Sequence, residues 1–389
     1  MRLAQRIWWL AFGCLPACAK PAALLPSPAA PGSGPARAAT PAQVAAPLPT
    51  ERAGAAKPSA LVGEALALPG ATGPVSLDFL FYERKQSRVW VPAGGTGSVD
   101  VFDINSRQFA RVAGFKTAER ETHGKKRALG PSSGAVGDGF AYVGNRASDE
   151  VCAIELRTLS LGKCLKLPAP VDGIEFVPST RQVWVTMPSA HAIAVLDVAP
   201  QGTLALAGKI ELDGEPEGYA LDEPHGLFLT NLEDKGSTLR LDLKTHEIRD
   251  TWPTGCAADG PRGVAADSKR QLIFVACTDH VQALDAAHDG ARLGTLDTGA
   301  GLDIIDYAPS TGLLYAAAGK ASRLTVAHVG DRGLFDVVAV GDTAVGARNA
   351  VADERGNIFV ADPQGAHLLV FRAPEPPPGQ SVTQGDRAR

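Results

Sequence analysis

The chain has 389 residues, of which 45% are hydrophobic and 21% charged, and its net charge is −4. This length is enough for one large domain with a substantial core, or for two ordinary domains. The near-balanced charge provides no electrostatic footprint for nucleic acid, and glycine and proline lack the strict triplet period of collagen. The six cysteines form no CxxC pair, so neither a zinc ribbon nor attached haem is indicated.

The N-terminal segment is typical of an exported protein. Arg2 and Arg6 flank a basic start, and the apolar run 7–12 is too short for a permanent membrane span but fits a secretory signal. Residues 15–18 resemble the bacterial lipobox and end in Cys18, although Pro16 departs from the usual pattern. We therefore predict a signal peptide over residues 1–18 with lipidation at Cys18. Plain secretion after cleavage nearby is the alternative.

Two flanking segments are predicted to lack folded structure. Between residues 19 and 60, 24 of 42 residues are alanine or proline, which leaves too few large apolar side chains to build a core. The C-terminal residues 374–389 are loose for a similar reason, because prolines cluster at their start. The sequence thus predicts a tether at 19–60, a folded domain at 61–373 and a tail at 374–389.

The folded region repeats a short apolar run whose central residue is aromatic. Seven such runs occur, each followed by a polar loop and a strand of alternating polarity, and their central residues are Trp90, Tyr142, Trp184, Phe228, Phe274, Tyr315 and Phe359. Each repeat has the pattern of four short strands separated by turn residues. This pattern predicts an all-β fold, a seven-bladed β-propeller with four-stranded blades.

The seventh repeat lacks a fourth strand, because the chain becomes proline-rich after Phe371. Residues 64–69 resemble the fourth strands of other repeats, such as 163–168. We expect this N-terminal strand to complete the last blade and close the ring, which hides strand edges that invite aggregation. One repeat carries a charged insertion, residues 116–127, which we expect to be a solvated loop above the channel mouth.

Four cysteines follow the signal, and the sequence alone allows three pairings between them. Cys152 and Cys164 lie on neighbouring strands of one repeat, on either side of a tight turn. Cys256 and Cys277 lie at strand ends that reach the same face of the propeller. Because an exported chain is expected to oxidise its thiols, we predict the disulfides Cys152–Cys164 and Cys256–Cys277.

One polar column provides the candidate ligand site. The residues that open the innermost strands enter the central channel, one from each blade: Ser76, Ser133, Asp172, Glu217, Arg262, Asp303 and Arg348. Arginines held between acids present a planar fork, so Arg262 and Arg348 are suited to anchor a small polar or anionic ligand. The alternative is an ion-paired plug whose charges satisfy one another.

The strand pairs also carry a family resemblance. Residues 140–145 and 227–231 are similar to the YVTN signature, and residues 356–362 are similar to the NHL strand pair. Residues 64–372 therefore resemble the YVTN- and NHL-type seven-bladed propellers. The resemblance implies the fold but leaves the activity open, because such propellers include lactonase-like enzymes and cell-envelope binding proteins.

The resemblance further suggests a metal site. In gluconolactonase-type propellers, Glu, Asn and Asp at strand ends bind a divalent cation, which here points to Glu217, Asn145, Asn231 and Asp362. The first blade departs from that pattern, because Ser76 stands where an acid is expected. The alternative is that these side chains cap turns.

We expect an exported monomer of the periplasm or outer membrane, held by its lipid anchor, or else a secreted protein. Its leading function is binding or scaffolding in the cell envelope. The expected partner is an envelope protein or a small polar or anionic ligand, and not nucleic acid. The alternative is a lactonase-like hydrolase with a divalent cation as cofactor, for which no catalytic residue is assigned. Docking to a redox partner is a third, weaker alternative.

Overall fold

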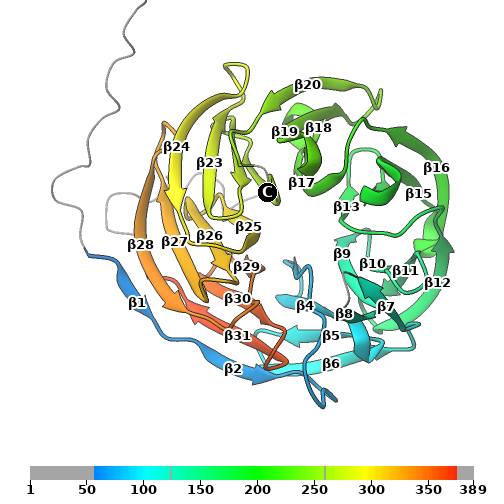
Figure 1. Cartoon of the computed structure of the whole chain (residues 1–389). Coiled ribbons are helices and arrows are strands. Elements are labelled where there is room, and N and C mark those ends of the chain that lie inside the picture. Colours follow the sequence, from blue (N-terminus) through cyan, green and yellow to red (C-terminus); the bar gives the residue numbers. More distant parts are fainter. Residues whose placement is uncertain (1–56, 123–124, 258–259, 375–389) are drawn as a thin grey trace, which may run out of the picture. The chain divides into compact units, whose positions relative to one another are not determined.

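The computed structural model describes residues 57–122, 125–257 and 260–374. The predicted signal peptide, Cys18 and most of the two flanking segments lie outside these residues. The described chain forms seven antiparallel sheets of four or five strands, arranged as blades around a common centre (Figure 1). This confirms the predicted seven-bladed β-propeller. Among the described residues, no helix has the length and hydrophobicity needed to cross a bilayer.

Each of the first four blades consists of four consecutive strands, and their order within the blade leads from the channel to the outer rim. Their bounds are β3 (Phe81–Glu83), β4 (Arg88–Ala93), β5 (Ser98–Asp103), β6 (Gln108–Ala113); β9 (Pro131–Gly137), β10 (Phe140–Asn145), β11 (Glu150–Glu155), β12 (Ser160–Lys166); β13 (Ile174–Val177), β14 (Gln182–Met187), β15 (Ala192–Val198), β16 (Leu204–Glu211); and β17 (Pro216–Asp222), β18 (Leu227–Leu232), β19 (Ser237–Asp242), β20 (Ile248–Pro253).

Blades five to seven follow the same plan, and two N-terminal strands join the last two blades. Their bounds are β21 (Val264–Asp267), β22 (Leu272–Ala276), β23 (His280–Asp285), β24 (Ala291–Asp297); β25 (Leu302–Ala308), β26 (Leu313–Ala318), β27 (Arg323–Val329), β28 (Phe335–Asp342) with β1 (Ser59–Leu61); and β29 (Ala350–Ala352), β30 (Asn357–Asp362), β31 (His367–Arg372) with β2 (Glu64–Ala67).

The N-terminal strands close the ring. Strand β2 pairs antiparallel with β31, with Glu64 opposite Val370, which confirms the predicted fourth strand of blade seven. Strand β1 was not expected. It pairs in parallel with β28, with Ser59 opposite Ala339, and gives blade six a fifth strand. The two strands run along the outside of adjacent blades in Figure 1, so one short segment ties blade six to blade seven.

The predicted aromatic column forms the centre of each blade. All seven side chains are fully buried. The buried residues divide into seven clusters, each shared by two neighbouring blades. For example, the rings of Trp184 and Phe228 lie 5.0 Å apart between blades three and four, and those of Phe274 and Tyr307 lie 5.0 Å apart between blades five and six. The repeat therefore places one apolar layer at every inter-blade interface.

Both predicted disulfides are present. Cys152 and Cys164 are directly opposite on β11 and β12, with Cα atoms 3.9 Å apart. Cys256 and Cys277 join the end of blade four to the end of the second strand of blade five, with Cα atoms 5.2 Å apart. The second bridge lies near the channel end at which the innermost strands begin.

The charged insertion forms a hairpin rather than an irregular loop. Strands β7 (Ala118–Thr122) and β8 (Lys125–Leu129) pair with each other and with no blade. The hairpin packs on the turn that follows β4, where a Cβ at Gly95 would meet Ala128. Arg127 on β8 acts electrostatically on Asp78 of the channel, which places the hairpin beside the channel mouth, as expected.

Candidate functional site

A ladder of backbone hydrogen bonds links the inner ends of neighbouring blades and shows which residues stand in the channel column. In each case the residue after a column position donates its N–H to the carbonyl of the next blade's column residue. The pairs are Phe79 to Ser132 (2.9 Å), Gly218 to Arg262 (3.2 Å), Gly263 to Asp303 (2.9 Å) and Ile304 to Arg348 (3.3 Å).

This ladder corrects the predicted column in the first two blades. The column residue of blade one is Asp78, which is buried, whereas Ser76 is exposed and lies two residues earlier. In blade two it is Ser132; the neighbouring Ser133 turns its hydroxyl to the backbone carbonyl of Asp172 instead. In blade two the column residue lies 10 residues before its aromatic residue, Tyr142, instead of the 11 or 12 found in the other blades.

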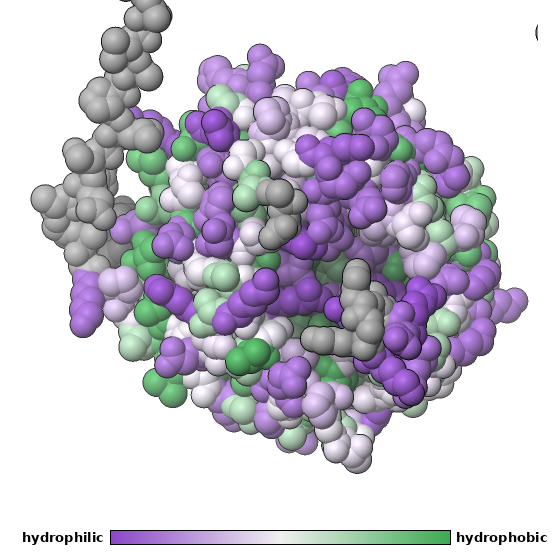
Figure 2. Space-filling model, viewed as in Figure 1, coloured by the Kyte–Doolittle hydropathy of each residue, from purple (hydrophilic) through white to green (hydrophobic). Residues whose placement is uncertain are grey.

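Five of the predicted column residues are brought together at one end of the channel, and Asp78 joins them. Arg348 lies between two acids, with its guanidinium nitrogens 2.9 Å from Asp78 and 3.0 Å from Asp303. Arg146 pairs with Asp78 on its other side and with Asp172. The result is a chain of ion pairs that crosses five blades, from blade three through blades two, one and seven to blade six. Figure 2 shows hydrophilic side chains gathered around the centre of the ring.

The remaining column residues form a second group on the other side of the mouth. Arg262 lies 2.6 Å from Glu233 and 3.9 Å from Glu217. Glu217 therefore has no close cation of its own. Burial, together with the nearby Asp303, Glu233 and Asp78, raises its pKa to about 8. A carboxyl group with this pKa holds its proton at neutral pH.

The two groups differ in how their acids are balanced. Burial opposes ionisation of Asp78, but Arg146 and Arg348 outweigh it and hold the pKa of Asp78 below its usual value. For Asp303 burial prevails over Arg348, and its pKa is raised. Burial likewise raises the pKa of Glu233 against the effect of Arg262. The arginines near Glu233 and Asp303 are thus too few to offset the burial of these acids, whereas two arginines offset the burial of Asp78.

We call these eight side chains the mouth ring. The ring receives at least one charged side chain from every blade, and its members are Asp78, Arg146, Asp172, Glu217, Glu233, Arg262, Asp303 and Arg348. Sequence reasoning missed Arg146 and Glu233 because they belong to turns after the second strands rather than to the column. Water reaches the ring, since the Arg348 side chain is 43% exposed.

An aromatic floor closes the channel just below the ring. Phe79 follows Asp78 in blade one, and Tyr219 lies two residues after Glu217 in blade four. Their ring centroids are 5.7 Å apart, so side chains from distant blades meet across the channel. Gly173 makes room for this contact, because a Cβ there would come within 2.3 Å of the Tyr219 ring. The mouth is therefore a cup with charged walls.

The predicted metal ligands do not converge. Asn231 donates to the carbonyls of Arg262 and Gly263 and accepts from Thr238, so its amide is occupied between two blades. Asn145 and Asp362 accept backbone N–H groups of their own following turns. Over the described ranges, no group of three or more His, Cys, Asp or Glu side chains is arranged to hold a metal ion.

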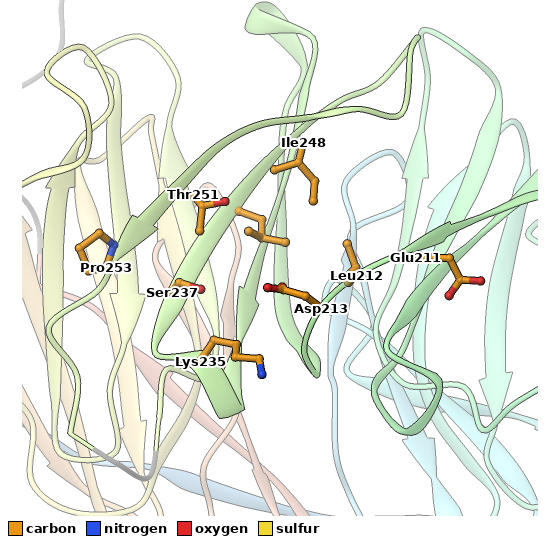
Figure 3. A pocket seen from close by; sticks show the side chains of 9 residues that line it. Glu211, Leu212, Asp213, Lys235, Ser237, Ile248, Thr251 and Pro253 are labelled. Carbon is orange, nitrogen blue, oxygen red and sulfur yellow. The ribbon is translucent and has the colours of Figure 1, made fainter. Parts of the chain in front are cut away.

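A cavity lies elsewhere, on the outer rim between blades three and four (Figure 3). It has a volume of about 680 Å³ and is lined by the end of β16 and by β19 and β20. Two of its charged residues are paired locally, Lys235 with Asp234 and Glu211 with Lys209. Because no charges converge in it from several blades, we place the candidate site at the mouth ring instead.

The fold and its channel define a seven-bladed β-propeller, and similar solved structures agree. Virginiamycin B lyase from Staphylococcus aureus has a TM-score of 0.62 at 12% identity, over 81% of this chain and 100% of its own. The β-propeller domain of Myceliophteria thermophila Cps50 (Swd1) has a TM-score of 0.61 at 11% identity, over 80% of this chain and 99% of its own. Hydrazine synthase of Kuenenia stuttgartiensis scores 0.63 at 15% identity, covering 79% and 99%.

These likenesses extend to the fold alone, because sequence identity is so low. They include both an enzyme and a WD40-type module, since the WD40 repeats of RRP9 match with a TM-score of 0.62 at 10% identity, over 79% of this chain and 97% of theirs. No family model matches the chain, and no curated protein matches it in sequence. The fold therefore constrains the architecture and leaves the activity to be argued from the mouth ring.

Proposed function

We propose that this protein is an exported β-propeller of the cell envelope that binds a ligand in the mouth ring and performs no catalysis there. The observation that carries the proposal is the convergence of charged side chains from all seven blades on one end of the channel. The blades repeat their apolar layers, but these charges do not repeat. A feature that breaks the repeat at one place is suited to a specific ligand.

Three features support the proposed setting in the envelope. Two disulfides fit an oxidising compartment. The start of the chain has the pattern of a secretory signal ending in a lipobox-like Cys18. The strand pairs resemble those of YVTN- and NHL-type propellers, which include cell-envelope binding proteins. WD40-type neighbours also use this fold, which is consistent with a binding or scaffold module.

The hydrolase alternative has no comparable support in the geometry. The amides of Asn145 and Asn231 are engaged in hydrogen bonds, and Asp362 fixes a turn. A lactonase-like mechanism would require these groups to turn toward a shared cation. Tight binding of Ca²⁺ or another divalent cation by the purified propeller would favour the lactonase-like hydrolase over the binding protein.

Paired measurements on Arg348→Gln and Arg262→Gln test the proposal against a purely structural ring. A structural ring predicts a loss of about 1–3 kcal/mol for Arg348→Gln, because Asp78 and Asp303 lose a shared partner that is partly open to water. A binding ring predicts that ligand affinity falls more than stability does.

The readout is a thermal-shift panel of small carboxylates, phosphates and amines, applied to the wild-type protein and both variants. The matched control is Lys235→Gln on the outer rim, which should preserve every stabilising hit. Hits that disappear with the ring variants and persist with the control support the proposal. A panel without any hit, combined with large melting shifts in both ring variants, would reduce the ring to a structural plug.

A further inference from the structure

The mouth ring contains more acids than cations. It holds five carboxyl groups, Asp78, Asp172, Glu217, Glu233 and Asp303, and three guanidinium groups, Arg146, Arg262 and Arg348. Even when the neighbouring Arg127 of the hairpin is counted, the acids remain in excess. Both Arg262 and Arg348 are already paired with acids of the ring. An anionic ligand would have to displace those acids, and the under-neutralised Glu217, which holds a proton at neutral pH, offers an anion no positive charge in return.

The surplus lies on one side of the ring. The nearest cation to Glu217 is Arg262 at 3.9 Å, and the same arginine lies closer to Glu233, at 2.6 Å. Among the acids, Asp303 and Glu233 raise the pKa of Glu217 the most. This side of the cup therefore lacks one positive charge.

Unpartnered polar atoms stand beside the same ring. Ser132 occupies the column position between Asp78 and Asp172; it is 6% exposed, and its hydroxyl has no hydrogen-bond partner in the described structure. The second oxygen of Asp172 accepts no hydrogen bond either, although Asp172 is 4% exposed. Buried polar groups normally find a partner, and these two oxygens belong to blades two and three of the ring.

The floor of the cup favours the same kind of ligand. The rings of Phe79 and Tyr219 lie in contact beside the column residues Asp78 and Glu217, and Tyr219 is also stacked on Phe228. Aromatic faces attract cations and offer nothing to an anion. Acids at the wall with aromatic rings at the base are the groups used to recognise organic ammonium ions.

We infer that the mouth ring binds an organic cation, a primary alkylammonium group, seated against Glu217 and Asp303 above the Phe79–Tyr219 floor. The inference rests on the proposed function and specifies its ligand class. It replaces the small anionic ligand expected from the two column arginines. The ammonium group could belong to a free diamine or to a lysine side chain, because the chemistry recognised is the same.

Binding should release a proton. Glu217 faces Asp303, Glu233, Asp78 and the guanidinium of Arg262, and it also interacts with Arg348. Burial and the three acids keep Glu217 protonated up to about pH 8, because its pKa is raised to that value. A bound ammonium ion favours the carboxylate, so affinity should increase as the pH rises toward 8.

The experiment is isothermal titration of the propeller with putrescine, and in a second arm with a blocked pentapeptide that has one central lysine. Wild-type protein should bind at least one of the two, and its binding enthalpy should vary with the ionisation enthalpy of the buffer. Binding by putrescine alone identifies a free amine, and binding by the peptide alone identifies a protein side chain. Either result supports the cation site.

Two variants locate the site. Glu217→Gln should weaken binding about tenfold or more and abolish the buffer dependence, while the fold is kept because an uncharged amide replaces a protonated carboxyl. Tyr219→Leu should weaken binding about two- to thirtyfold through loss of the aromatic face. The control is Glu211→Gln, an exposed acid of the outer cavity, which should leave the affinity unchanged.

A third arm, with citrate, separates the two proposals. Citrate binding that is lost in Arg348→Gln, without binding of either amine, would overturn the cation site and leave the proposed binding function standing. Failure of both amines and citrate at millimolar concentration would contradict both. Amine binding that Glu217→Gln leaves intact would also overturn the site as assigned here.

Discussion

The inter-blade interfaces and the mouth ring are built largely from the same strands, yet their chemistry is opposite. At each interface one fully buried aromatic residue, such as Trp184, packs against its neighbour blade, and the seven interfaces are variations of one pattern. In the mouth ring no two consecutive blades supply the same charge arrangement. The interfaces are dominated by apolar contact, whereas the ring holds more carboxyl groups than guanidinium groups.

This contrast separates stability from function. Apolar layers that repeat from blade to blade contribute to stability in proportion to the area they bury. A ring with unbalanced charge contributes less, because burial penalises its acids, as the raised pKa of Glu217 shows. We therefore expect changes at the interfaces to unfold the protein and changes in the ring to alter binding or pH response.

Truncation of the closing strand should have the largest effect. Deleting residues 19–57 should leave stability nearly unchanged, and extending the deletion to residue 62 removes only the three-residue β1. Extending it through Leu68 removes β2 and a buried leucine, and should cost on the order of 5 kcal/mol. Chemical denaturation of the three proteins provides the measurement. Equal stability of the shortest and longest deletions would reject closure by β2.

Removing one aromatic residue of an interface should come next. Trp184→Ala should destabilise the protein by about 3–5 kcal/mol, because Trp184 is fully buried against Phe228. The control is Leu206→Ala on the outer strand β16, where the side chain is 49% exposed and a change within about 0.5 kcal/mol is expected. A loss below about 1 kcal/mol for Trp184→Ala would mean that the interface is not the main source of stability.

Loss of the disulfide within blade two should have an intermediate effect. Cys152 and Cys164 close a loop of 12 residues, so replacing both by alanine should cost about 3 kcal/mol. Thiol counting on the wild-type exported protein checks that the bond exists, and urea denaturation measures its effect. Free thiols at all four positions would contradict both bridges.

The smallest and most specific effect should come from Glu217→Gln. The folded protein holds the Glu217 proton to about pH 8, whereas the unfolded chain loses it near the ordinary pKa of 4.5. The folded state thus binds more protons, and this group makes stability fall as the pH rises from 4.5 to 8. Glu217→Gln should flatten that decline, which a melting-temperature series in pH would show. Glu175, whose pKa burial raises to about 7, supplies a background of the same sign.

The candidate site was predicted in part. Five column residues were placed correctly because a nearly constant spacing links them to the aromatic column: Asp172, Arg262 and Asp303 lie 12 residues before their aromatic residue, and Glu217 and Arg348 lie 11 before theirs. Asp78 keeps this spacing, 12 residues before Trp90, whereas Ser76 does not. The spacing was thus a usable signal for blade one. No such signal exists for Arg146 and Glu233, which reach the ring from turns of variable length.

The amino-acid sequence by itself determined the number of blades, the buried aromatic layers and closure by β2. Each of these depends on contacts within a blade or between equivalent positions of adjacent repeats, and periodicity reveals such contacts. The placement of the strands also favoured the two disulfides that are present among the three possible pairings. Only the tertiary structure decided which charges meet, that Phe79 and Tyr219 close the channel, and that β1 lies on blade six. The Phe79–Tyr219 contact joins blades one and four across the ring, the Arg348–Asp78 pair forms where the ring closes, and β1 lies outside the repeats. Their geometry depends on the closed circle rather than on any single repeat.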